Sequence, residues 1–291
     1  MSIKEKIIEL LLAFCALITV LTTFGIIYIL FSESYQFFKE VSIVHFLTDK
    51  EWTPLFADKQ YGIMALMSGT LLTSFIAMLV ALPLGIIIAV YLNEYANKKV
   101  RSYLKPILEI LAAIPTVVYG FFALLVVTPF LKILFPDISG FNALSAGIVM
   151  GIMIIPLVSS LSEDALYAVP KSLREASYGM GATKFQTSFR VLVPAASSGI
   201  IVSFILAISR AEGETMIVAI AAGQQPRLTA NPLVPVETIT TYIVQVSSGD
   251  VVNGSVEYRT IFAAGITLFI FTFLLNNISH FVRKRFRQQY E

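Results

Sequence analysis

The sequence has little charge and almost no histidine or cysteine. Only 14% of its 291 residues are charged, whereas soluble domains carry about 25%. A single cysteine, Cys15, excludes a disulfide framework, and together with two histidines, His45 and His280, it excludes the common zinc-ligand spacings. The net charge of +2 is too small to indicate a nucleic-acid partner.

Motifs for nucleotide binding and nucleophilic catalysis are also missing. The sequence contains no G-x-x-x-x-G-K-[ST], so this chain cannot hold ATP phosphates in a P-loop. It contains no G-x-S-x-G nucleophile elbow and no paired acid/base or metal constellation. A membrane enzyme is therefore disfavoured, and we expect neither covalent chemistry nor a cofactor in this chain.

Long apolar runs dominate what is present, since 56% of the residues are hydrophobic. Runs of about 20 apolar residues match the thickness of a bilayer, and in lipid the backbone must bond internally. The runs are far longer than the short alternating segments of a β-barrel. The sequence predicts an all-α integral membrane protein with about six crossings, near Leu10–Phe31, Ile63–Leu92, Leu111–Leu134, Leu144–Leu161, Gly199–Ala222 and Ile261–Val282. Pro106 and Pro115 predict a break or kink near the start of the third segment.

The cations predict the orientation of these spans. If both termini are cytoplasmic, 14 of the 21 lysines and arginines lie inside and six outside, and Arg210 alone lies within a span. The positive-inside rule therefore favours two cytoplasmic termini and an even number of crossings. Two long loops, about Ser32–Tyr61 and Gly223–Arg259, would then lie outside, with Trp52 either at the interface or facing a partner protein.

The long cytoplasmic loop, residues 162–195, has the pattern of a docking element. Pro170 is suited to start a helix, and Gly179 and Gly181 interrupt the helical spacing that follows. We expect a short helix, a glycine turn and a second short helix ending near Pro194. A compact, partly apolar helix on a charged loop suits insertion into a groove of another protein.

The fifth apolar segment contains three charged residues, Arg210, Glu212 and Glu214. Charges within a span are costly, so these should face protein or water. Arg210 and Glu214 are four residues apart and can pair on one helix face, while Glu212 points away, towards a partner subunit in our interpretation. Either this pair only fixes the helix in its bundle, or Arg210 lines a path for a tetrahedral oxyanion. Gly213 leaves room for a local break.

Weaker features accompany this cluster. Gly147 and Gly151 permit close helix packing. Five hydroxyl residues in the second and third apolar segments could face a passing anion or bond their own backbone, namely Thr70, Thr73, Ser74, Thr116 and Tyr119.

The docking loop contains a spaced motif that ends in proline. Glu175-Ala176-Ser177 is followed after three residues by Gly181, after nine more by Val191, and after one more by Val193-Pro194. This motif resembles the "EAA" loop of ABC importer permeases. The spacing matches throughout, and the departures Ser177, Val191 and Val193 are small or apolar. The resemblance implies the architecture of a type I ABC importer permease. It also implies that Glu175, Ala176, Ser177, Gly181 and Pro194 couple the chain to an ATP-hydrolysing subunit.

Three further stretches resemble the phosphate-specific permeases of this family, namely residues 210–216, 114–120 and 91–96. The resemblance runs from about Tyr61 onward. It implies import of inorganic phosphate with Arg210 and Glu214 as the transport residues. The partners it implies are a sister permease in a heterodimer, two ATP-binding subunits and an extracytoplasmic phosphate-binding protein, in the plasma (inner) membrane of a prokaryote.

This resemblance divides the chain into residues 1–62, with the first crossing and an outside loop, and a permease core of five crossings, residues 63–291. The alternatives are a permease for another oxyanion, such as sulfate or molybdate, and a secondary transporter or channel that needs no ATP. Neither the resemblance nor the residues decide between an identical and a sister partner permease.

Overall fold

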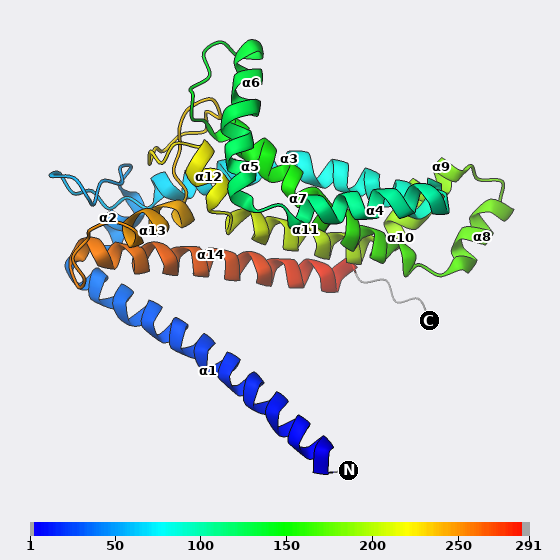
Figure 1. Cartoon of the computed structure of the whole chain (residues 1–291), viewed down its shortest axis with the longest axis horizontal. Helices are drawn as coiled ribbons and strands as arrows, with labels where there is room; N and C mark the ends of the chain where they lie inside the picture. The colour runs from blue at the N-terminus through cyan, green and yellow to red at the C-terminus, as the bar shows by residue number, and fades with distance from the viewer. Residues whose placement is uncertain (1–2, 287–291) are drawn as a thin grey trace.

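A computed structural model of the chain describes residues 3–286, which fold mainly into helices (Figure 1). Within residues 3–286, five helical spans are long and apolar enough to cross a membrane, and a pair of helices bent by 72° makes a sixth if it counts as one span. The single spans are Glu5–Glu40, Met64–Tyr95, Thr116–Leu134, Ala143–Tyr167 and Val256–Ile278, and the bent pair is Lys184–Ala195 with Ser197–Glu212. The predicted helical membrane fold is confirmed.

Three long helices extend beyond the apolar segments that predicted them, namely α1 (Ile3–Glu40), α7 (Ala143–Tyr167) and α14 (Val256–Phe286). The helix α3 (Met64–Val90) instead lies within its predicted segment, Ile63–Leu92. The fourth segment was expected to end at Leu161, but α7 continues through Glu163 to Tyr167. Backbone hydrogen bonding continues where the side chains become polar, so hydropathy alone places helix ends too early.

The predicted break near the third segment is confirmed at Pro115. It separates α4 (Lys98–Ala113) from α5 (Thr116–Phe122), which continues through a π-helical turn, η2 (Ala123–Val127), into α6 (Thr128–Leu134). Ile114 is extended, with φ −63° and ψ 129°, as expected for a residue that precedes proline. Pro106, in contrast, lies inside α4.

The predicted fifth span, Gly199–Ala222, is not one continuous helix. It consists of α11 (Ser197–Glu212) and α12 (Met216–Ala221), separated by Gly213, Glu214 and Thr215. The break that Gly213 was expected to permit is therefore present, and it falls within the charged cluster.

The docking loop forms the predicted two short helices with a glycine turn. α8 (Lys171–Gly179) is followed by α9 (Lys184–Thr187), the π-helical turn η3 (Ser188–Leu192) and α10 (Val193–Ala195). Gly181 makes the turn with a φ of +80°. Gly179 is the last residue of α8, so the helical spacing ends there as expected.

The two central helices, α3 and α7, pack closely through glycines. A Cβ atom on Gly147 would lie 2.7 Å from Cβ of Ile76, and one on Gly151 would lie 2.8 Å from the carbonyl oxygen of Ala77. Larger side chains would therefore force the helices apart. The close packing predicted for Gly147 and Gly151 is confirmed.

The first helix diverges from the other helices along most of its length (Figure 1). The apolar part of α1 is not buried within the chain. Near its C-terminal end, the hydroxyl of Ser34 donates to the carbonyl oxygen of Phe262 in α14, 2.9 Å away.

That end of the molecule also carries α2 (Ile43–Thr48) and α13 (Ile239–Ser247), and we name it the α2–α13 end. Trp52 is 1% exposed and packs edge-on against Tyr242 with 5.0 Å between ring centroids. The expectation that Trp52 faces the interface or a partner is wrong, because it belongs to this chain's own core. The division at residues 62 and 63 stays a prediction.

Candidate functional site

The break between α11 and α12 positions the charged residues. The amides of Gly213 and Glu214 still bond to the carbonyls of Ser209 and Ala211, at 3.3 and 3.2 Å. The hydroxyl of Thr240 donates to the carbonyl oxygen of Glu214, 2.9 Å away, so the polar backbone of the break is satisfied by a distant segment. The break is therefore a defined structure rather than a frayed helix end.

Arg210 and Glu214 pair across this break as the sequence predicts. Nη1 of Arg210 lies 2.5 Å from Oε2 of Glu214. The carboxylate also accepts weakly from the amide of Ile217 in α12, at 3.4 Å. The side chain of Glu214 is 3% exposed and that of Arg210 is 41% exposed. The carboxylate is thus buried behind the cation, and the cation faces open space.

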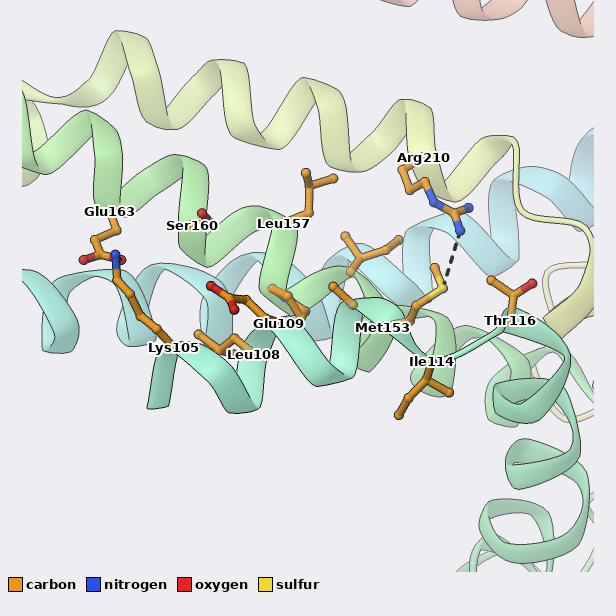
Figure 2. Close-up of a pocket in the computed structure, with 13 residues that line it drawn as sticks. Lys105, Leu108, Glu109, Ile114, Thr116, Met153, Leu157, Ser160, Glu163 and Arg210 are labelled. Atoms are coloured by element: carbon orange, nitrogen blue, oxygen red, sulfur yellow. Dashed lines mark hydrogen bonds and ion pairs between the residues drawn. The ribbon is translucent and has the colours of Figure 1, made fainter. Parts of the chain in front are cut away.

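Arg210 faces a cavity of about 450 Å³ between α4, α7 and α11. Figure 2 shows Arg210 and Thr116 at one end of this cavity and Lys105 and Glu163 at the other. Nη2 of Arg210 is 3.6 Å from the sulfur of Met153, a weak acceptor. Within the described residues the guanidinium bonds only to Glu214 and Met153, so most of its donors are available to a ligand. The cavity can admit a small anion with its hydration water.

The opposite end of the cavity contains a buried carboxylate shared by two cations. Glu163 on α7 is 3% exposed, and its Oε2 is 3.1 Å from Nζ of Lys105. Its other oxygen bonds to Arg101, one turn earlier on α4. Arg101 and Lys105 are among the 14 cations predicted to lie inside, but their contact with Glu163 was not predicted from the sequence. Arg101 and Lys105 lie four residues apart on one face of α4, and this spacing indicates a shared acid. It does not indicate which acid of the chain that is.

Glu109 and Thr116 also line the cavity. Glu109 lines it and is exposed, so the cavity is mixed in charge rather than uniformly positive. Among the candidate hydroxyl residues, Thr116 alone lines it. Thr70, Thr73 and Tyr119 donate to backbone carbonyls, and buried Ser74 has no partner within the described residues.

Glu212 does not face a partner subunit as expected. It is 2% exposed, and within the described residues its Oε2 has no hydrogen-bond partner. The helical spacing places it away from Arg210, but that side of α11 is covered by the chain itself.

The residues of the docking loop lie together at the opposite end from α13 (Figure 1). Glu175 and Ala176 are exposed on α8, and the hydroxyl groups of Ser177 and Thr187 are 2.9 Å apart, which joins α8 to α9. Gly181 makes the turn between the two helices, and Pro194 lies beyond it in α10. The loop therefore presents an exposed face, while the Arg210 cavity lies deeper among the long helices.

Comparison with known proteins places the chain in one family. Residues 81–288 match the family described as "Binding-protein-dependent transport system inner membrane component". A probable ABC transporter permease protein of Bacillus subtilis, YqgH, is 34% identical over 300 residues, which cover 98% of this chain and 97% of that protein. The phosphate transport system permease protein PstC of Mesorhizobium japonicum is 33% identical over 280 residues, which cover 90% of this chain and 84% of that protein.

Solved structures share the fold. A chain of the bacterial ABC transporter involved in import of the acidic polysaccharide alginate gives a TM-score of 0.68 at 19% identity, covering 98% of this chain and 99% of that one. A chain of the MetNI methionine ABC transporter in an inward-facing conformation gives a TM-score of 0.58 at 19% identity. The match covers 78% of this chain and 95% of that one. The chain belongs to the binding-protein-dependent transport system inner membrane component family and has the fold of ABC importer permeases.

Proposed function

We propose that this chain is the permease subunit of an ATP-driven importer of inorganic phosphate and forms half of the translocation pathway. The observation that carries the proposal is Arg210, which is half-exposed to the cavity and backed by the buried carboxylate of Glu214. The name of the relative from Mesorhizobium japonicum, a phosphate transport permease, supports phosphate as the anion.

The chemistry of Arg210 fits a tetrahedral oxyanion. A guanidinium is planar and always charged, and it offers a fork of donors to two oxygens at once. In this structure Glu214 and Met153 occupy only part of that fork. Because Glu214 neutralises the cation, the anion is held weakly enough to leave again, as transport requires.

Energy for transport would come from separate subunits. We infer that the docking loop around Glu175–Gly181 enters a groove of an ATP-binding subunit, and that two such subunits drive a pair of permeases between outside-open and inside-open states. The exposure of Glu175 and Ala176 supports this docking role. A sister permease would complete the path.

A phosphate-binding protein would deliver the anion to the α2–α13 end. A solved alginate ABC transporter in complex with its periplasmic protein has the same fold, with a TM-score of 0.66. Both termini would then be cytoplasmic, on the same side as the docking loop. The plasma (inner) membrane is the corresponding location.

The experiment is uptake of labelled phosphate by proteoliposomes that contain the complete complex and its binding protein. We expect uptake that requires ATP and persists in excess sulfate and molybdate. Uptake of sulfate or molybdate instead would overturn the substrate and keep the machinery. Uptake without ATP or the ATP-binding subunits would overturn the importer itself.

A further inference from the structure

A buried carboxylate at the end of α3 is paired with the docking loop. Glu94 lies in η1 (Tyr91–Tyr95), the π-helical turn that ends α3, and its side chain is 4% exposed. Nη2 of Arg174 on α8 lies 2.5 Å from its Oε1, and the side-chain amide of Asn93 donates to the same atom at 3.0 Å. Arg174 directly precedes Glu175, the exposed acid of the docking loop.

The second helix of the docking loop, α9, also contacts η1. The ammonium group of Lys184 on α9 lies 4.9 Å from the ring centroid of Tyr95, at cation–π distance. Leu173 on α8 packs on the hydrophobic cluster that contains Ala89 and Val90 of α3. Both short helices of the loop are therefore fixed to one end of α3 by charge, ring and apolar contacts.

The other end of α3 reaches the segment that stabilises the charged break. The amide of Ile239 donates to Oγ1 of Thr70 at 3.1 Å. A Cβ on Gly69 would lie 2.1 Å from the carbonyl oxygen of Glu237, so the two backbones are in direct contact. One residue beyond Ile239, Thr240 bonds the carbonyl of Glu214. α3 thus spans from the docking loop to the support of the Arg210–Glu214 pair.

We propose that Glu94 is a positioning residue for transport, through which displacement of α8 by an ATP-binding subunit is passed to α3 and on to the Arg210–Glu214 site. This inference rests on the proposed docking role of the loop. Separating Arg174 from Glu94 would leave a nearly buried charge without its cation, which is far more costly than separating an exposed pair. The loop and α3 therefore move together rather than slide past each other.

The test measures ATP hydrolysed per phosphate imported by the complete complex in proteoliposomes. Glu94→Gln keeps the shape of the side chain and removes its charge. We expect it to raise this ratio about tenfold, within the usual range of coupling between sites, with subunit stoichiometry and basal ATP hydrolysis unchanged. Asp164→Asn is the matched control. Asp164 is an exposed acid near the C-terminal end of α7, and this variant should keep the wild-type ratio.

A double-variant cycle separates this role from simple packing. Arg174→Gln should raise the ratio of ATP hydrolysed to phosphate imported as Glu94→Gln does. The two substitutions together should raise this ratio no further than either alone. The reversed pair, Glu94→Arg with Arg174→Glu, should restore the wild-type ratio. A wild-type ratio in either single variant would overturn the proposal, as would additive losses in the double variant. If the complex imports an anion other than phosphate, the proposed substrate fails, but the ratio for that anion still tests Glu94.

Discussion

Arg210 and Glu214 form an asymmetric pair across the break between α11 and α12, with Nη1 and Oε2 2.5 Å apart. The carboxylate is buried and the guanidinium is open to the cavity. A pair that served only to fix the helix would gain nothing from exposing its cation to a space of about 450 Å³. This asymmetry supports the proposal that the cavity is part of the anion path.

Replacing both members of the pair distinguishes a path residue from a structural ion pair. Replacing the buried carboxylate together with its cation leaves no unpaired buried charge, so Arg210→Met with Glu214→Leu should leave the complex assembled. We expect no phosphate uptake, because the cation is gone. The measurements are subunit stoichiometry after purification and the initial rate of ATP-dependent uptake. Wild-type uptake would mean that the pair only fixes the helix.

Gly181 should tolerate substitution much less well than Gly179. A side chain at Gly181 must adopt a φ of +80°, whereas Gly179 ends α8 and a Cβ there meets no atom within 4 Å. Gly181→Val should distort the turn and abolish phosphate-stimulated ATP hydrolysis, while Gly179→Ala should keep it. Equal behaviour of the two variants in co-purification and ATPase assays would count against the docking role of this turn.

Loss of the shared acid Glu163 should destabilise the contact between α4 and α7. Glu163→Gln leaves Arg101 and Lys105 without their carboxylate, and both are partly solvated. The expected cost is about 1–3 kcal/mol in the free energy of unfolding. The thermal unfolding temperature of the purified complex should fall, and Asp164→Asn should leave it unchanged. An unchanged temperature for Glu163→Gln would show that this acid does not hold α4.

Burial raises the pKa of Glu237 to about 8 from an ordinary value of 4.5. The folded chain then keeps a proton on this carboxyl in a pH range where the unfolded chain has lost it. Its contribution to stability is fully present below about pH 4.5 and falls as the pH rises to about 8, by at most about 1.4 kcal/mol per pH unit.

Thermal unfolding temperatures across this range check the effect of Glu237. Glu237→Gln cannot ionise, so its unfolding temperature should fall less with rising pH than that of the wild type. Identical pH slopes for the two proteins would contradict the raised pKa.

Local features of the structure could be predicted from the sequence. The pairing of Arg210 with Glu214, the break at Gly213 and the turn at Gly181 follow from helical spacing and glycine conformation within a few residues. The six apolar segments follow from the thickness of a bilayer. Each of these depends on short-range rules that need no knowledge of the packing.

Contacts between distant segments could not be predicted in the same way. Glu163 bonds to Arg101 across 62 residues, and Glu94 bonds to Arg174 across 80. The burial of Trp52 and Glu212 likewise depends on which segments cover them in the fold. Hydropathy and spacing identify a polar residue in an apolar segment, but only the packed chain selects its neighbour.

The initial rate of ATP-dependent phosphate uptake by the complete complex carrying Arg210→Ala tests the role of Arg210 most directly. We expect uptake to be abolished while subunit stoichiometry and ATP-binding subunit docking are retained. Arg210→Lys, which keeps the charge but loses the donor fork, should restore only part of the rate. Wild-type uptake by a well-assembled Arg210→Ala complex would contradict the assignment of Arg210 to the anion path.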